Sequence, residues 1–234
     1  TRFSLFFPEK RDFFLEGAGI FAFGGIGSGN GGSPGDLPVM FFSRRIGLNN
    51  GQEVPVIAGG RVNGRAGRYS IGALNIETGD KPSAKAVTTN FSTLRIKRDV
   101  LRRSNVGLIA THRTAGLSGA GANTLLGGDA NFFLLTNLTA NLFYARTDTD
   151  GRQGDGTDTY RGVAEYAGDR YGVSIEHLLI GPNFDPQVGY VRRVDFRKTS
   201  LEARFMPRPK SRRSRVRKYT YLGSLDYEIG RAHV

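Results

Sequence analysis

The sequence predicts an all-β fold in which roughly ten strands form an antiparallel up-and-down sheet. The first observation is a period of two, because apolar and polar residues alternate in many successive runs. The second is composition, since 33 Gly, 16 Phe and 9 Tyr favour strands and turns over helices. The third is that no segment longer than about 12 residues has a convincing helical period of 3.6.

The alternation places the strands in order along the chain. The run 138–146 alternates well, and only Thr136-Asn137 separates it from the run 130–134, which predicts a tight hairpin. Gly168-Asp169-Arg170 predicts another short turn. The remaining strands are expected over 54–64, 67–78, 87–99, 104–114, 160–166, 171–179, 200–205 and 219–227.

The connections differ in length. The turns at 136–137 and 168–170 are short, whereas 115–122 and 148–158 are long and polar. Short turns at one end and long loops at the other are typical of outer-membrane β-barrels. A soluble sandwich or a lipocalin-like barrel shows the same alternation with the faces inverted. Periodicity does not decide which face meets lipid, so the pattern leaves both architectures open.

In a membrane barrel the polar faces line the lumen. We expect Arg95 and Lys97 there, opposite the apolar Leu94 and Ile96. Aromatic residues at strand ends are predicted to form an interfacial girdle; the candidates are Tyr144, Tyr171 and Phe205.

Composition and charge exclude several classes of protein. The chain has no Cys, so disulfides, thiolate metal sites and cysteine nucleophiles are excluded. The sequence contains no run of about 18 apolar residues, so it predicts no transmembrane helix. The 33 Lys and Arg residues against 21 Asp and Glu residues give a net charge of +12, which by itself favours an anionic partner.

Several stretches resemble a known family. They are 6–17 (FFPEKRDFFLEG), 41–47 (FFSRRIG), 67–75 (GRYSIGALN), 89–91 with 98–105, 168–173, 184–193 (FDPQVGYVRR) and 224–227 (SLDY). Together they resemble a family of bacterial outer-membrane proteins labelled domain of unknown function 5916. The similarity covers nearly the whole chain up to Tyr227.

The resemblance implies a C-terminal β-barrel in the outer membrane of Gram-negative bacteria, usually preceded by a carbohydrate-binding domain of family 9 type. The chain would then be an internal piece of a longer protein and would form an incomplete barrel. The activity of the family is not established, so the resemblance supplies no catalytic residues for this chain. We expect outer-membrane lipid as a partner, no cofactor and no nucleic acid.

Three clusters of charge are candidate sites. Glu9, Lys10, Arg11, Asp12 and Glu16 form either a constriction in the lumen or a segment that braces the barrel wall. Two pairs of adjacent arginines are candidate ligand-binding residues: Arg44 with Arg45, and Arg192 with Arg193. If both pairs lie in strands, one Arg faces the lumen and the other an interfacial phosphate. Ordinary ion pairs with Asp or Glu are the alternative.

The third cluster is the basic segment 208–218, which Pro207 and Pro209 separate from the preceding strand. A loop at the outer surface would bind lipopolysaccharide phosphates or glycans, and a solvated loop is the alternative. The candidate residues are Arg208, Lys210, Arg212, Arg213 and Arg215.

Catalytic and metal motifs are few. The Asp-rich loop 148–158 does not follow the EF-hand order, and the Gly-rich loop 24–32 lacks the strand–helix context of a phosphate cradle. His112 and His177 lie on apolar faces, where packing is the usual role of a histidine. No nucleophile elbow or zinc-protease motif is present in the sequence.

The chain divides into three expected parts. Residues 1–50 form a barrel entry segment, 51–227 form the barrel strands, and 228–234 are expected to be a sequencing artefact. The last seven residues are Glu-Ile-Gly-Arg-Ala-His-Val. Back-translated as GAG ATC GGA AGA GCA CAC GTC, they match the start of a common short-read sequencing adapter.

Taken together, the sequence predicts part of an outer-membrane β-barrel module of a surface or transport protein, with a link to glycan handling implied by the family. One alternative is part of a carbohydrate-active hydrolase. Another is a basic soluble domain that binds nucleic acid, which the net charge and the interleaved aromatics would favour.

Overall fold

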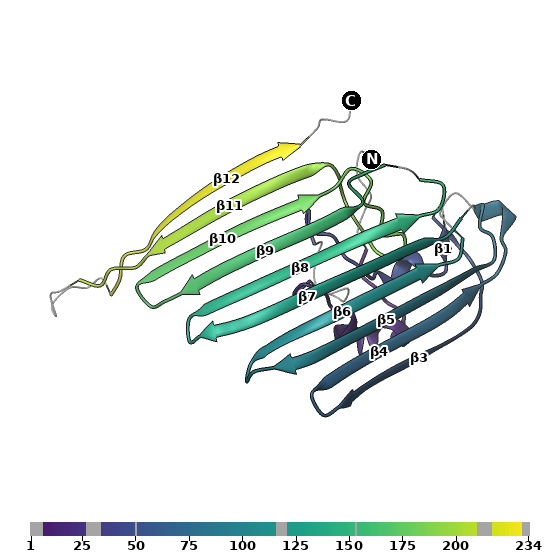
Figure 1. Ribbon diagram of the computed structural model, residues 1–234, viewed down its shortest axis with the longest axis horizontal. Helices are drawn as coiled ribbons and strands as arrows, with labels where there is room; N and C mark the ends of the chain where they lie inside the picture. The colour runs from purple at the N-terminus through teal and green to yellow at the C-terminus, as the bar shows by residue number, and fades with distance from the viewer. Residues whose placement is uncertain are drawn as a thin grey trace.

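The prediction of an all-β up-and-down sheet is confirmed. In the computed structural model, ten strands form one antiparallel sheet in the order of the chain, from β3 to β12 (Figure 1). The structure describes residues 7–26, 34–49, 51–115, 121–152, 154–209 and 217–230. Each predicted strand is present, with bounds that differ by a few residues.

The strands of the sheet are β3 (Val56–Ala66), β4 (Tyr69–Thr78), β5 (Thr89–Val100), β6 (Ser104–Arg113), β7 (Asn123–Leu135), β8 (Leu138–Thr149), β9 (Asp158–Ala167), β10 (Tyr171–Ile180), β11 (Phe196–Phe205) and β12 (Tyr221–Gly230). The smaller elements are α1 (Asp12–Leu15), three 3-10 helices, η1 (Ala18–Phe21), η2 (Ser43–Arg45) and η3 (Pro82–Ala84), and a hairpin of β1 (Leu48–Asn49) and β2 (Gln52–Glu53).

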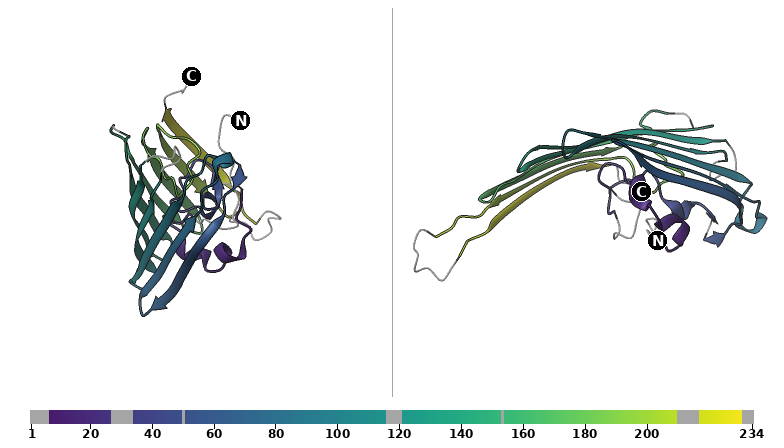
Figure 2. Two further views of the ribbon diagram at one scale, coloured as in Figure 1. Left: turned by 90° about the vertical axis from the view of Figure 1, so that its right-hand side faces the viewer. Right: turned by 90° about the horizontal axis from the view of Figure 1, so that it is seen from below.

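The sheet is curved and open. Seen from below in Figure 2 it forms an arch, and β3 and β12 are its two edges. Residues 228–230 continue the ladder of β12 opposite 196–198 of β11. Backbone pairing of this kind requires no particular side chains, so it does not bear on whether these residues derive from an adapter.

The connections divide the sheet into a short-turn end and a long-loop end. The short-turn end carries the turns 67–68, 101–103, 136–137 and 168–170, of which the sequence predicted the last two. The long-loop end carries 79–88, 114–122, 150–157 and 181–195. One connection differs in length: β11 ends at Phe205 and β12 begins at Tyr221, both at the short-turn end, and the 15 residues between them include the basic segment.

The convex, outer face of the sheet is apolar and uncovered. Its large side chains stay exposed, with Leu108 at 65% and Leu126 at 61% relative accessibility. Others of the same face are Val62, Ile71, Leu94, Leu142, Tyr144, Val173, Ile175, Leu201 and Leu225. The register joins them into rows across the sheet, for example Ile71, Ile96 and Leu108 on β4, β5 and β6.

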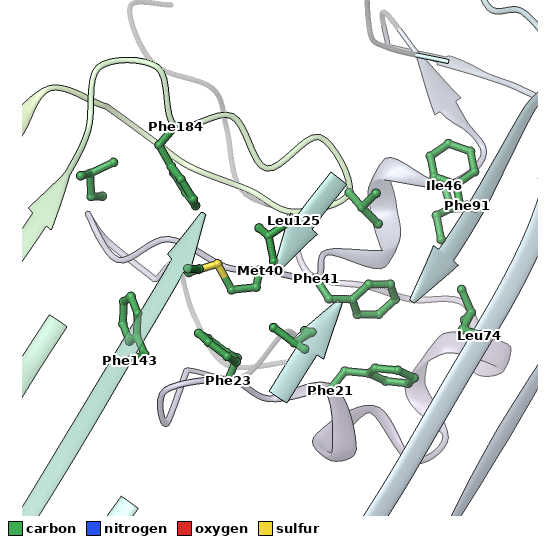
Figure 3. Packing of buried hydrophobic residues seen from close by; sticks show 14 of the residues in the cluster. Phe21, Phe23, Met40, Phe41, Ile46, Leu74, Phe91, Leu125, Phe143 and Phe184 are labelled. Atoms are coloured by element: carbon green, nitrogen blue, oxygen red, sulfur yellow. The ribbon is translucent and has the colours of Figure 1, made fainter. Parts of the chain in front are cut away.

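The concave, inner face is covered by the N-terminal part of the chain. Residues 7–26 and 34–49, which we name the cover segment, lie beneath the arch in Figure 2. Its Phe21, Phe23, Met40, Phe41 and Ile46 are buried against the sheet. Figure 3 shows them beside residues of the strands and of the β10–β11 connection, namely Leu74, Phe91, Leu125, Phe143 and Phe184.

Candidate functional site: the inner face and its cover

A buried ion pair lies at the centre of the inner face. Arg95 of β5 and Asp129 of β7 meet across Gly107 of β6, with Nη1 of Arg95 2.7 Å from Oδ1 of Asp129. Nη2 of Arg95 donates a hydrogen bond to Oδ2 at 2.8 Å, whereas the contact of Nη1 with Oδ1 is an ion-pair contact without hydrogen-bond geometry. Their side chains are only 0% and 1% exposed. The prediction that Arg95 lies opposite Leu94 on the polar face is therefore confirmed.

The cover segment is attached to this ion pair. The backbone N–H of Gly24 donates to Oδ2 of Asp129 at 2.9 Å. Nε of Arg95 donates to the carbonyl of Ala22 at 3.2 Å, and its guanidinium lies 5.2 Å from the ring centroid of Phe23. The pair therefore joins three elements, and the additional partners offset the cost of burying two charges.

Glycines on the inner face make room for the cover segment. A Cβ at Gly72 of β4 would lie 2.7 Å from Cγ2 of Ile20. A Cβ at Gly127 of β7 would lie 2.9 Å from Cζ of Phe23. Both distances are shorter than real Cβ contacts, so larger residues at these positions would displace the cover segment.

A second charged network holds the cover segment together. Both oxygens of Glu9 accept from the guanidinium of Arg11, at 2.9 and 2.7 Å, and the Ser43 hydroxyl donates to Oε2 at 2.6 Å. Arg11 also donates to the carbonyls of Ser43 and Ile46. Burial raises the pKa of Glu9, but the hydrogen bonds from Arg11, Ser43 and the backbone outweigh it and lower the pKa to about 2.

A polar row crosses the inner face beside the cover segment. Asn131 donates to Asn105 at 3.0 Å, and Asn141 donates to Asn131. The row ends in an ion pair in which Nε of Arg161 lies 2.5 Å from Oε1 of Glu176. These half-buried side chains come from β6, β7, β8, β9 and β10. They give the inner face a continuous set of hydrogen-bonding groups.

The inner face is open where the cover segment does not reach it. Near the short-turn end a hollow of about 440 Å³ lies between β9 and β12. The polar residues that line it from the inner face are Glu165, Ser174, Glu202, Arg204 and Ser224. This part of the face is therefore accessible to a polar solute.

The first pair of adjacent arginines does not lie in a strand. Arg44 and Arg45 belong to η2, so the expectation that strand geometry sends them to opposite faces is wrong for this pair. Nη1 of Arg44 donates to the carbonyl of Pro8 at 2.8 Å, and Nε of Arg45 donates to that of Gly189 at 3.0 Å. Arg44 therefore joins two parts of the cover segment, and Arg45 joins the cover segment to the β10–β11 connection.

The second pair also lies outside the strands, so the same expectation is wrong there. Both arginines approach one carboxylate, that of Asp36 in the cover segment. Arg193 binds it through two nitrogens, at 3.0 and 2.8 Å, whereas Nη1 of Arg192 is 3.9 Å away. Arg193 also pairs with Glu228. Arg193 thus makes the ion pairs that the alternative hypothesis described.

The other candidate residues are spread over the sheet. Lys97 lies on the inner face of β5, two residues from Arg95. Arg208 binds both carboxylate oxygens of Asp169 at the short-turn end, at 2.7 and 2.8 Å. Four predicted residues of the basic segment lie outside the described residues: Lys210, Arg212, Arg213 and Arg215. Among the described candidates, the structure therefore brings together Arg95 with Lys97 on β5 and Arg192 with Arg193 at Asp36.

Sequence reasoning missed three residues of this site: Asp129, Asp36 and Arg113. Asp129 alternates with apolar neighbours on β7, and that alternation was the available signal. Asp36 is 157 residues away from its partner Arg193, and no local pattern indicates the pairing. Arg113 is buried at the end of β6 with its guanidinium 5.1 Å from the ring centroid of Phe91.

The two strand histidines lie on the outer face and bond to a threonine of the neighbouring strand. Nδ1 of His112 is 2.9 Å from the hydroxyl of Thr124, and Nδ1 of His177 is 2.9 Å from that of Thr199. The described residues contain no group of three or more His, Cys, Asp or Glu side chains that could hold a metal ion.

A comparison with family models, curated proteins and solved structures finds no match for this chain. Among the described residues, no helix is long and apolar enough to cross a membrane.

Proposed function

We propose that the chain is part of an outer-membrane β-barrel whose lumen is narrowed by its own cover segment. The orientation of the two faces carries this proposal. A soluble barrel or sandwich buries its apolar face and exposes its polar face. Here the concave face, which carries apolar residues such as Phe91 and Phe143 as well as the charged Arg95 and Asp129, is covered, whereas the large apolar side chains of the convex face are exposed. Lipid is the surrounding that makes such an arrangement favourable.

The strand lengths fit a bilayer. The ten strands of the sheet have 10 to 13 residues each. Ten residues at a rise of about 3.3 Å span about 33 Å, and a tilt of about 40° reduces this to about 25 Å across the membrane. That height equals the apolar band of outer-membrane barrels. The open edges at β3 and β12 require further strands in lipid, so we propose that other strands complete the barrel.

The role that we propose is passage or anchoring in a surface or transport protein. The row from Asn105 to Glu176 and the hollow beside Glu202 provide polar groups along the lumen. Such groups suit a polar solute, and glycans are the class that the family resemblance suggests. The cover segment would restrict this passage because it fills the inner face of the earlier strands.

The position of the basic segment changes one expectation. In outer-membrane barrels the short turns face the periplasm and the long loops face outside. The described residue Arg208 of the basic segment lies at the short-turn end, where it binds Asp169 of the β9–β10 turn. We therefore no longer propose lipopolysaccharide phosphates, which lie on the outer side, as the partner of this segment.

Membrane fractionation of the full-length protein tests the proposal. We expect the protein in the outer-membrane fraction, resistant to alkaline carbonate and released only by detergent. A protein that is recovered in the soluble fraction and binds nucleic acid in a salt-sensitive manner would instead support the basic soluble domain.

A further inference from the structure

The short-turn end of the sheet carries five exposed arginines without an acidic partner. They are Arg68, Arg98, Arg102, Arg103 and Arg170, and none of them makes an ion pair with a residue that the structure describes. The turns 67–68, 101–103 and 168–170 supply four of the five, and Asp169 is the only acidic residue in these turns. This rim therefore has an excess of positive charge.

Three of these arginines lie against aromatic rings. The guanidinium of Arg98 is 5.3 Å from the ring centroid of Tyr69, and that of Arg103 is 5.0 Å from the ring centroid of Phe133. Arg170 lies 5.7 Å from two rings, those of Tyr171 and Phe205. Contact with a ring face orients a guanidinium but leaves its N–H donors free for an anion.

The rings of Tyr69, Tyr171 and Phe205 border the outer apolar face. Phe133 instead shares the inner face of β7 with Asp129 and Asn131. Tyr171 and Phe205 stack at 5.2 Å, and Phe205 continues the row to Tyr221 at 6.2 Å between ring centroids. Tyr69 and Tyr166 lie at the same end and are more than 40% exposed. The rim thus combines an apolar surface, exposed aromatic rings and free guanidinium groups within one band.

We infer that this rim binds the phosphate groups of anionic phospholipids in the leaflet that surrounds the short turns. A guanidinium forms paired hydrogen bonds with phosphate oxygens. Tyrosine rings favour the boundary between acyl chains and headgroups. A phospholipid leaflet supplies both phosphate groups for the arginines and acyl chains for the aromatic rings, whereas free phosphate supplies only the first. The inference rests on the proposed function and specifies the lipid chemistry at one end of the barrel.

Two charge-matched double variants test the inference. The first, Arg98→Gln with Arg170→Gln, removes two arginines that lack an acidic partner and lie against rings at the border of the outer face. The second, Arg65→Gln with Arg208→Gln, removes two exposed arginines of the same end that are already bound to Asp99 and Asp169. The full-length proteins are placed in bilayers of phosphatidylcholine with a minor fraction of phosphatidylglycerol, and the lipid that remains bound is measured by native mass spectrometry.

We expect the first double variant to lose about tenfold or more of its preference for phosphatidylglycerol and the second to change by less than about twofold. Equal losses in the two variants would overturn the inference. It would also be overturned if inorganic phosphate at the same concentration displaces the lipid. A first variant that binds single-stranded DNA less well but keeps its preference for phosphatidylglycerol would overturn it too.

A tryptophan placed at Ala164 on the outer face separates this inference from the proposed function, because its quenching by brominated lipid reports insertion in the same samples. Insertion without lipid preference overturns only the inference. Absence of insertion overturns the proposed function as well.

Discussion

Arg95 and Asp129 form a hydrogen-bonded ion pair across Gly107, and both side chains are buried beneath the cover segment. The two residues are 34 positions apart and come from strands that are not neighbours. The pair connects the sheet to residues 22–24 of the cover segment through three contacts. It is therefore the point at which the stability of the sheet and the packing of the cover segment depend on the same groups.

Replacement of one partner leaves an uncompensated buried charge. We expect Asp129→Ala to lower the free energy of unfolding by about 3–5 kcal/mol. The double variant Arg95→Met with Asp129→Leu removes both charges, so its loss is expected to be clearly smaller. Urea unfolding of the wild type and the single and double variants in detergent measures the coupling. Additive losses would contradict the interaction of the two residues.

The ion pair of Arg95 and Asp129 also requires a residue without a side chain at position 107. A Cβ at this position would lie 2.5 Å from Nη1 of Arg95 and 2.7 Å from Oδ1 of Asp129. We expect Gly107→Ala to cost about 1–3 kcal/mol, since the buried pair has no free space into which it can shift. The control is Gly128→Ala, whose Cβ would meet Leu108 at an ordinary 3.6 Å. Equal unfolding midpoints for both variants would contradict the packing argument.

The network that holds the cover segment together is expected to weaken at low pH. Glu9 has a pKa of about 2 in the folded state against an ordinary value of 4.5, so the unfolded state binds more protons between these values. The stabilisation, about 3 kcal/mol, is complete above pH 4.5 and is lost as the pH falls towards 2. Below pH 2 both states are protonated and no further loss follows from this group.

A single tryptophan reports this transition, because the chain contains none. Phe14→Trp places it in the cover segment, where Phe14 is buried and lies 4.2 Å from the guanidinium of Arg11. We expect the emission to shift to longer wavelength between pH 4.5 and 2. Glu9→Gln is expected to abolish this pH dependence, whereas Glu16→Gln, with a side chain 85% exposed, is expected to retain it. The same titration in all three proteins would refute the assignment to Glu9.

The cover segment is also expected to control conductance. Glu9→Gln with Ser43→Ala removes the hydrogen bonds that close its internal network. In planar bilayers we expect this variant of the full-length protein to show a higher single-channel conductance than the wild type. Glu16→Gln is again the control. Equal conductance of the three proteins would show that the cover segment does not limit passage.

The strands were predictable from the sequence because alternation is a local property. All ten were found, from the first at 54–64 to the last at 219–227, against observed bounds of Val56–Ala66 and Tyr221–Gly230. Alternation is symmetric, however, and does not say which face is covered. That information came from long-range contacts, in which the cover segment packs on the apolar residues of the inner face and binds Arg95 and Asp129.

The candidate site was only partly predictable. Arg95 was placed correctly because it alternates with Leu94, but its partner Asp129 depends on the register of three strands. The adjacent arginines were misplaced because the rule for strands does not apply to η2 or to the β10–β11 connection. Tyr144 was expected at a strand end, yet it lies in the middle of β8. Tyr171 and Phe205 do lie at strand ends, where they stack.

The central claim is that the convex face contacts lipid, and two neighbouring residues of β9 test it most directly. Ala164 points outward and Glu165 inward, both are exposed, and they lie at nearly the same depth. Each is replaced by tryptophan in the full-length protein, which is then placed in vesicles that contain brominated lipid. We predict strong quenching for Ala164→Trp and little for Glu165→Trp, with iodide in water giving the reverse order. Equal quenching of both, or stronger lipid quenching of Glu165→Trp, would contradict the claim.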